Sequence, residues 1–292
     1  LGYKPIMDLN LDDLKKLLNK SNSASLEDFL SAFTHTISVM QSFDNIERIS
    51  FEAAEDMFLN GIKYYESRYA PLYSVNDNLS PLDVIDAINS GFNKAYELYG
   101  IKSGLIVCGM RNDPKDVKKL TELACTNIKN NIIGFDIAGP EIGYPPSNYN
   151  KEFRRLKENN INLTIHGGEG AGVEYIQEAL DSGADRIGHG VRIIEDIDIS
   201  QKPYKLGKTS KEILERNIML EICISSNIHT KMYKSVYEHP IKVLYDLGFN
   251  ISVNTDNRLM SNTSMKKELA LASSIGINKK INDDKLPYSF LS

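Results

Sequence analysis

The sequence predicts an α/β fold closed into a (β/α)8 barrel of the TIM type, and three observations lead to this prediction. Short apolar segments typical of strands alternate with longer segments of helical periodicity. Several apolar segments, such as LIVCGM at 105–110, lack the alternation of a half-exposed strand and therefore suit a parallel sheet buried on both faces. Nearly every one runs directly into a polar or glycine-rich cluster, and in a barrel the strand ends that carry such clusters meet on one face.

Residues 10–60 are predicted to form three helices that precede the strands. Apolar residues recur there at helical spacing in two sets. The sets are Leu11, Leu14, Leu17 and Leu18, followed by Leu26, Phe29, Leu30 and Phe33. We expect each set to form the buried stripe of a helix.

The rest of the chain predicts seven strands separated by helices. The strands are expected at 61–68, 105–110, 132–137, 161–165, 186–188, 219–223 and 250–253. The helices are expected at 79–99, 114–129, 149–159, 172–182 and 210–215. Right-handed crossovers allow an open doubly wound sheet or a closed barrel. Because neither GxGxxG nor GxxxxGK[ST] occurs, as a doubly wound nucleotide-binding sheet would require, the barrel is favoured.

Composition and charge exclude other classes of protein. The 34 Lys and Arg against 39 Asp and Glu give a net charge of −5 spread along the chain, whereas a nucleic-acid-binding protein needs a clustered basic face. No apolar run approaches the roughly 20 residues that cross a bilayer. Three cysteines in 292 residues suit the cytoplasm better than a disulfide framework. No linker divides the chain, so residues 1–292 are expected to form one barrel domain.

Side chains with catalytic chemistry follow three of the predicted strands. Two glycines separate His166 from Glu169, and they let the backbone turn sharply and a ligand approach. His189 stands between two glycines at the end of the next strand, and Asp256 follows the last strand. Two imidazoles and two carboxylates on one face of a barrel predict a metal and acid–base site, and zinc or a similar divalent ion suits these ligands.

The other three histidines are interpreted as structural or surface residues. They are His35 in a predicted helix, His229 on an expected loop near the pocket, and His239 at an expected helix start. Cys108 and Cys223 lie in apolar strands without CxxC spacing, so they are interpreted as core residues.

Six motifs cover nearly the whole chain. They are ESRYAP (66–71), GFDIAGPE (134–141), TIHGGEG (164–170), RIGHGVRIIED (186–196), EICISSNIHT (221–230) and ISVNTDNRLMSNTS (251–264). In this order they resemble the adenosine deaminase family in its bacterial-type branch. The resemblance implies a metal-dependent hydrolase barrel of purine salvage, located in the cytoplasm. Such enzymes remove the 6-amino group of adenosine and deoxyadenosine, which gives inosine and ammonia in the case of adenosine.

The resemblance also implies a role for each site residue. His166 and Asp256 would bind one zinc ion per chain, and Asp256 would also contact the attacking water. Glu169 would donate a proton to purine N1, and His189 would hold and deprotonate the water. The backbone of Gly139 would contact purine N3. These roles agree with the chemistry, because attack on an aromatic C6 needs a nucleophile at neutral pH and a proton for the ring nitrogen.

The sequence departs from the family pattern at its two ends. The family carries a His-x-His pair on its first barrel strand as two further zinc ligands, and no His-x-His occurs in this sequence. Since seven strands are predicted where a barrel needs eight and the sequence begins with Leu1 rather than Met, we expect this strand upstream of Leu1 rather than lost in evolution. The family's final helix is likewise expected beyond Ser292.

Asn257 is a further departure, because animal members of the family have an Asp there that bonds purine N7. The Asn amide can still donate a hydrogen bond, so adenosine recognition is preserved in principle. Two alternatives stay open: a deaminase of adenine or of a modified adenosine, and a catalytically inactive barrel that binds a nucleoside. A purine nucleoside is the expected partner, and neither a nucleic acid nor a membrane is expected.

Overall fold

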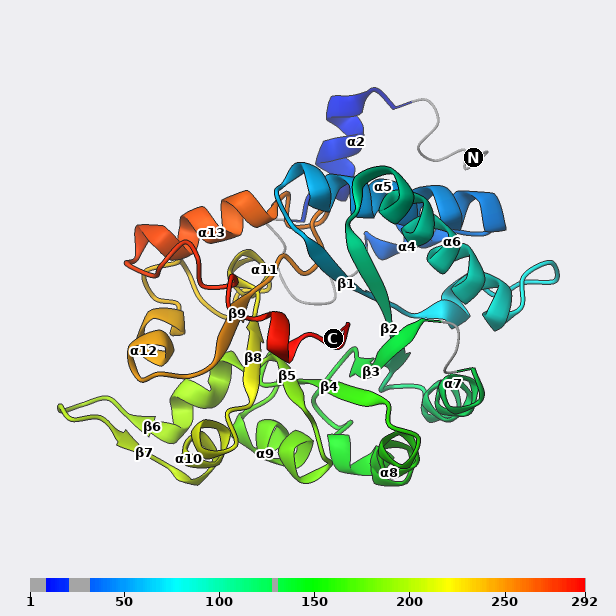
Figure 1. Ribbon diagram of the computed structural model, residues 1–292. Helices are drawn as coiled ribbons and strands as arrows, with labels where there is room; N and C mark the ends of the chain where they lie inside the picture. Colours follow the sequence, from blue (N-terminus) through cyan, green and yellow to red (C-terminus); the bar gives the residue numbers. More distant parts are fainter. Residues whose placement is uncertain (1–8, 21–31, 128–130, 292) are drawn as a thin grey trace.

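Seven parallel strands form one curled sheet in the computed structural model, which describes residues 9–20, 32–127 and 131–291 (Figure 1). Their order in the sheet follows the sequence, and every neighbouring pair is parallel. The strands are β1 (Tyr64–Tyr69), β2 (Lys102–Met110), β3 (Ile132–Ala138), β4 (Asn162–Gly167), β5 (Arg186–His189), β8 (Met219–Ile222) and β9 (Ile251–Val253). All seven predicted strands are confirmed, with bounds that differ by a few residues.

Helices cover the outer face of this sheet, as Figure 1 shows. They are α6 (Pro81–Tyr99), α7 (Pro114–Thr126), α8 (Asn150–Glu158), α9 (Val173–Asp181), α10 (Lys208–Glu215), α12 (Ile241–Asp246) and α13 (Met265–Ser274). A short helix, α11 (Ile224–His229), directly follows β8. The five helices predicted between the strands are confirmed, except that the end of the one expected at 114–129 falls partly outside the described residues.

Local sequence signals explain where these helices begin and end, and α6 is the clearest case. The Ser80 hydroxyl accepts from the Asp83 backbone N–H at 3.2 Å, while the Asp83 carboxylate accepts from the Ser80 N–H at 2.8 Å. Pro81 occupies the first helical position, where its missing N–H has no cost. The helix ends at Gly100, whose φ of +70° favours glycine.

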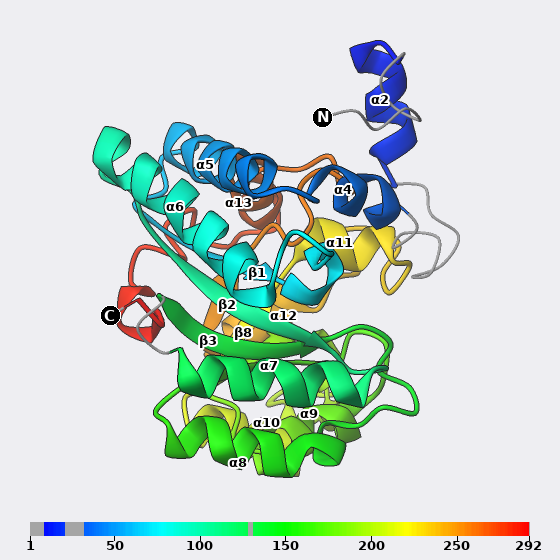
Figure 2. The same ribbon diagram turned by 90° about the vertical axis from the view of Figure 1, so that its right-hand side faces the viewer.

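Three described helices precede the sheet, as expected, but one predicted buried stripe is wrong. They are α2 (Leu11–Leu18), α4 (Phe33–Val39) and α5 (Phe43–Leu59). In α2 only Leu18 is buried and Leu11 is 65% exposed, because this short helix projects from the rest of the molecule (Figure 2). Leu26, Phe29 and Leu30 lie outside the described residues.

The expectation of a closed eight-stranded barrel is only partly confirmed. Within the described ranges, β1 and β9 are the two edges of the sheet, and no strand pairing joins them. What the structure shows is a seven-stranded parallel sheet curled into an open barrel. A two-stranded antiparallel hairpin, β6 (Ile197–Asp198) with β7 (Lys205–Leu206), was not predicted because strands of two residues carry no periodic signal.

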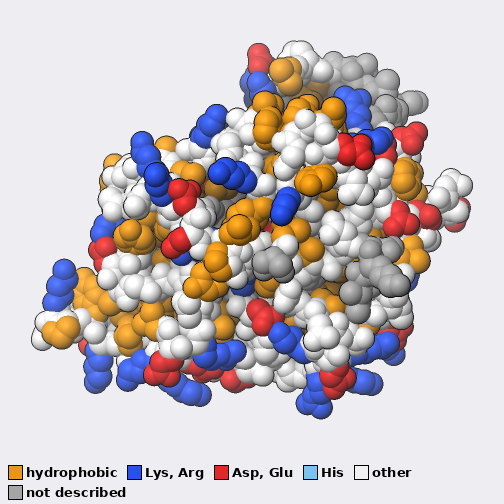
Figure 3. Space-filling view, in the orientation of Figure 1, with side chains coloured by type: hydrophobic (Ala, Val, Ile, Leu, Met, Phe, Trp, Pro, Cys, Tyr) orange, Lys and Arg blue, Asp and Glu red, His pale blue; other side chains and the backbone are white. Residues whose placement is uncertain are grey.

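The C-terminal segment closes one end of the curled sheet. Residues 286–291 lie in the middle of the ring of strands in Figure 1 and at the left side of the molecule in Figure 2, whereas α11 lies toward the other side. Figure 3 shows acidic and basic side chains interspersed on the face turned to the viewer. Among the helices of the described residues, none has the length and apolar character that a bilayer span requires. Cys108 and Cys223 are buried in the core, as predicted.

Candidate active site

Three of the predicted catalytic side chains converge where β4 and β5 end. These strands are neighbours in the sheet, and their register pairs His166 with Gly188 and Gly167 with His189. The two imidazole ring centres are 5.2 Å apart. The Nε2 atom of His189 lies 3.6 Å from a carboxylate oxygen of Glu169. The predicted grouping of His166, Glu169 and His189 is therefore present in the fold.

The ring of His166 is oriented by a buried carboxylate that the sequence analysis did not single out. His166 Nδ1 lies 2.8 Å from Asp136 Oδ2, and Asp136 is fully buried on β3. Burial lowers the pKa of His166, but the charge and the hydrogen bond of Asp136 outweigh it and raise the pKa overall. Because Nδ1 donates to Asp136, the neutral ring keeps its lone pair on Nε2, which is the arrangement of a metal-ligating histidine.

Glu169 lies in a loop whose backbone is hydrogen-bonded to the side chain of Glu141. The backbone N–H groups of Glu169 and Ala171 donate to the two Glu141 carboxylate oxygens at 3.2 and 2.6 Å. The Glu169 side chain is 14% exposed. Burial raises its pKa, and the charges of Asp256 and Glu141 act in the same direction, while the two histidines oppose them. A carboxyl group with a raised pKa can carry the proton that a general acid must donate.

Asp256 follows β9 and is held from both sides. One carboxylate oxygen accepts from the Ser226 hydroxyl on α11 at 2.7 Å, and the other accepts from the Asn257 amide at 2.9 Å. The φ angle of Asp256 is +49°, and that of His189 is +59°. Backbone in this left-handed region is costly for a residue other than glycine and is concentrated at functional sites.

Two glycines shape the space around these side chains. A Cβ atom on Gly188 would lie 3.2 Å from the His166 ring, so only glycine leaves the ring room in its present position. Gly139, the predicted substrate contact, follows β3 with a φ of +94°. A Cβ there would meet the end of Met110 at 3.0 Å. Gly139 is thus favoured by its backbone conformation, whereas a side chain at Gly188 would require the His166 ring to shift by a few tenths of an ångström.

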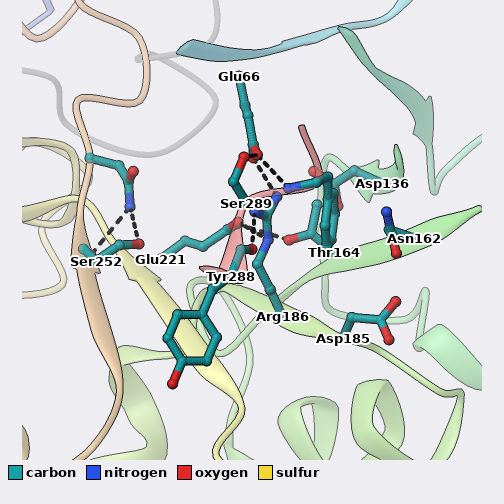
Figure 4. Close-up of polar contacts among 12 residues, drawn as sticks. Glu66, Asp136, Asn162, Thr164, Asp185, Arg186, Glu221, Ser252, Tyr288 and Ser289 are labelled. Carbon is teal, nitrogen blue, oxygen red and sulfur yellow. Dashed lines mark hydrogen bonds and ion pairs between the residues drawn. The ribbon is translucent and has the colours of Figure 1, made fainter. Parts of the chain in front are cut away.

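Next to the candidate site, charged and polar side chains from separate strands meet inside the curled sheet. We call this the interior network, and Figure 4 shows most of it. Its members are Glu66 and Arg68 of β1, Asp136 of β3, Thr164 of β4, Arg186 of β5 and Glu221 of β8.

Arginines join the carboxylates of the interior network. Arg186 lies 2.8 Å from both Glu66 and Glu221, and Arg68 lies 2.8 Å from Asp136 and also pairs with Glu221. The C-terminal segment caps the network, since the Ser289 hydroxyl donates to Glu66 at 2.7 Å.

The residues fit a zinc ion in their chemistry but do not supply a full ligand set. His166 offers Nε2, and each Asp256 oxygen retains a lone pair. Zinc sites use at least three protein ligands. In the part of the chain that the structure describes, no group of three or more His, Cys, Asp or Glu is arranged to hold a metal.

Other sequence-based assignments have mixed outcomes. His229 does not lie on a loop, because it is the last residue of α11. It lines a cavity of about 530 Å³ between α11 and α13, which none of the predicted site residues lines. His239 does precede a helix, but it is 3% exposed and bonds to Asn227, a contact that the sequence did not reveal.

Comparison with known proteins places this geometry in context. The profile of the family described as Adenosine deaminase matches residues 6–280. "Adenosine deaminase 1" of Streptomyces coelicolor is 40% identical over 275 residues, which are 91% of this chain and 69% of that protein. "Adenosine deaminase" of Mycobacterium marinum is 40% identical over 277 residues, 92% of this chain and 76% of that protein.

Solved structures with the same fold exist at lower sequence identity. The Arabidopsis N6-mAMP deaminase superposes with a TM-score of 0.80 at 22% identity, covering 97% of this chain and 84% of that one. At this identity the likeness concerns the fold.

Proposed function

The chain belongs to the adenosine deaminase family, and from this premise we propose that it hydrolyses adenosine to inosine and ammonia, and deoxyadenosine to deoxyinosine and ammonia. One water is consumed and one ammonia leaves for each nucleoside. The observation that carries the proposal is the placement of Glu169 3.6 Å from His189, beside a His166 whose Nε2 is left available for a metal. This combination offers a proton donor, a polar group for water and a metal ligand at the same point.

A zinc ion held by His166 and Asp256, together with ligands from outside the described residues, would supply Lewis-acid chemistry that makes water a nucleophile at neutral pH. The prediction that a His-x-His strand precedes Leu1 stays a prediction. Asp136 contributes by holding the His166 ring in the tautomer that presents Nε2.

Glu169 acts as the general acid in this proposal. Its raised pKa favours the protonated carboxyl group, and that proton passes to purine N1 as water adds to C6. Protonation at N1 makes C6 more electrophilic and removes the negative charge that would otherwise build up on the ring. The proton that Asp256 accepts from the water then passes to the amino group, which departs as ammonia. As the C6 carbonyl forms, the new C6 hydroxyl returns a proton to Glu169, and N1 keeps its hydrogen.

His189 holds the attacking water through Nε2, the ring atom that faces Glu169. The resemblance implies that it both holds and deprotonates this water. The hydrogen bond from Asn227 to Nδ1 supports the holding role, because a neutral ring that accepts at Nδ1 carries its hydrogen on Nε2. In this proposal Asp256 then takes part in accepting the proton of the water.

Substrate contacts are proposed for Gly139 and Asn257. The positive φ of Gly139 turns the backbone after β3 without a side chain, which permits close approach of a purine edge to the main chain. Asn257 Nδ2 donates one hydrogen to Asp256 and has a second available for purine N7.

The experiment is a substrate panel with the zinc-loaded protein. Adenosine and deoxyadenosine should be consumed with stoichiometric ammonia, while adenine and N6-methyl-AMP should be poor substrates. A preference for adenine or for the modified nucleotide would favour the alternative deaminase. Binding of adenosine without any turnover would favour the inactive nucleoside-binding barrel.

We propose a place for this activity in purine salvage in the cytoplasm. The absence of disulfides among its three cysteines suits a reducing compartment.

A further inference from the structure

A buried series of hydrogen bonds reaches His189 at Nδ1, the ring nitrogen other than the one that faces Glu169. The Ile241 backbone N–H donates to His239 Nδ1 at 3.1 Å. His239 Nε2 lies 3.2 Å from Asn227 Oδ1, and Asn227 Nδ2 lies 3.0 Å from His189 Nδ1. This series joins the start of α12 to α11 and then to the end of β5.

The first link sets the direction of every later one. A backbone N–H can only donate, so His239 Nδ1 must accept, and the neutral ring therefore carries its hydrogen on Nε2. That hydrogen is donated to Asn227 Oδ1, which leaves the Asn227 amide group to donate to His189 Nδ1. His189 consequently carries its own hydrogen on Nε2.

The far side of Asn227 confirms this orientation of the amide. Asn227 Nδ2 also lies 3.4 Å from the Met232 sulfur, and a thioether can only accept. If the amide were reversed, its oxygen would face the sulfur and its nitrogen would face a His239 atom that already carries hydrogen. Two independent partners, one at each end, thus require the same orientation.

Burial makes this series of hydrogen bonds rigid and keeps His239 neutral. Asn227 is fully buried, His239 is 3% exposed and His189 is 2% exposed, so water does not compete for these bonds. Burial lowers the pKa of His239 to about 3. The Tyr233 ring packs on the His239 ring with centres 4.9 Å apart and restricts its rotation.

We propose that Asn227 and His239 are positioning residues that fix His189 in the neutral tautomer with its hydrogen on Nε2. Both residues are buried, and each acts on the reaction through His189. The catalytic meaning of this inference rests on the proposed function, because a hydrogen on Nε2 is what allows His189 to hold a water oxygen beside Glu169. The tautomer itself does not depend on that function.

Nitrogen-15 NMR of histidine-labelled protein tests the tautomer directly, with and without zinc. The chain has five histidines, so substituting them singly assigns the spectrum. In the wild type, His189 should show a protonated Nε2 and an unprotonated Nδ1. In Asn227→Asp the amide donor becomes an acceptor of the same shape, so the His189 hydrogen should move to Nδ1. A wild-type His189 with hydrogen on Nδ1, or an unchanged pattern in Asn227→Asp, would overturn the proposal.

Kinetics supplies the second readout. Asn227→Asp should lower kcat for adenosine by at least about 10²-fold with little change in KM, since the residue contacts no substrate. Asn250→Asp is the matched control, because Asn250 is also buried and makes one side-chain hydrogen bond, to Asn217, away from the site. The control should keep both the wild-type tautomer and the wild-type kcat. An equal loss of kcat in both variants would show a general effect of a buried carboxylate and contradict the proposal.

His239 provides a test that does not depend on the folding of Asn227→Asp. His239→Gln retains a donor toward Asn227 Oδ1 and should keep most of the activity and the His189 tautomer. His239→Leu removes the donor, so it should lower the activity and let His189 carry its hydrogen on either nitrogen. Equal spectra in these two variants would refute the role of His239. If the tautomer responds as expected but no variant and no wild type deaminates adenosine, the proposed function fails while the positioning pair stands.

Discussion

One group of charged side chains lies inside the curled sheet and a second lies where its strands end, and the two groups differ in what neutralises their charges. In the interior network, Glu66, Glu221 and Asp136 each lie 2.8 Å from an arginine. We call His166, Glu169, His189 and Asp256 the site group. Within the described residues, no salt bridge joins Glu169 or Asp256 to a lysine or arginine, and their polar contacts are to histidine, serine and asparagine.

The effect on acidity is opposite although Glu221 and Glu169 are both largely shielded from water. Burial raises the pKa of Glu221, but Arg68 and Arg186 outweigh burial and bring it down to about 2. Burial raises the pKa of Glu169 as well, and there the neighbouring carboxylate of Asp256 adds to the effect. A carboxylate locked as an anion serves structure, whereas one poised to hold a proton serves catalysis. The two groups meet at Asp136, which contacts both Arg68 and His166.

The largest effect is expected from breaking the interior network at Arg186. Arg186→Met leaves Glu66 and Glu221 without their shared partner, and removing one side of a buried ion pair costs about 3–5 kcal/mol in the free energy of unfolding. Urea denaturation measures it. Arg216→Met, which breaks an exposed pair with Glu212, should cost less than about 1 kcal/mol. Similar losses in both variants would remove the structural role of the network.

Asp136 should couple the two groups. Asp136→Asn weakens the acceptor that orients His166, and loss of such a partner typically lowers metal affinity by about 10- to 100-fold. Competition with a chelator measures the zinc affinity. Asp246→Asn, which changes a surface carboxylate paired with Lys242, should leave it unchanged. Wild-type affinity in Asp136→Asn would mean that His166 needs no partner to present Nε2.

The contribution of Glu221 to stability should depend on pH, because its arginine partners lower its pKa. Its folded pKa of about 2 lies below the ordinary 4.5, so its contribution is fully present above pH 4.5 and is lost as the pH falls from there toward 2. Lowering the pH from 7 to about 3.5 should remove about 1 kcal/mol of this contribution. The difference between wild type and Glu221→Gln in urea midpoint isolates it. A difference that stays constant over this range would contradict the arginine pairing.

The sequence predicted every strand of the sheet because buried parallel strands leave uninterrupted apolar runs such as that of β2. It also predicted His166, Glu169 and His189 together, because neighbouring parallel strands bring their ends to one place. Closure of the sheet was not predictable in the same way, since it depends on pairing between edges far apart in the chain. The prediction that the apolar stripe of α2 is buried was wrong for a related reason. Periodicity identifies an amphipathic helix but not the surface that would cover its apolar face.

The supporting residues escaped sequence reasoning because their roles depend on three-dimensional contacts. Asp136 stood inside a motif as one acidic residue of an apolar strand, which was a usable signal, since a buried carboxylate needs a partner. Asn227 and His239 carried no such signal. They are 12 positions apart, and their hydrogen bond becomes visible only when α11 and the start of α12 are placed side by side.

The initial rate of inosine formation by zinc-loaded Glu169→Gln, compared with the wild type at equal folded protein, tests the central claim most directly. Glutamine keeps the shape and a hydrogen bond but has no proton to transfer. The account predicts a fall in kcat of about 10²- to 10⁴-fold with little change in adenosine binding and an unchanged free energy of unfolding. A kcat close to the wild-type value would remove Glu169 from the mechanism and with it the division between a structural and a catalytic group of charges.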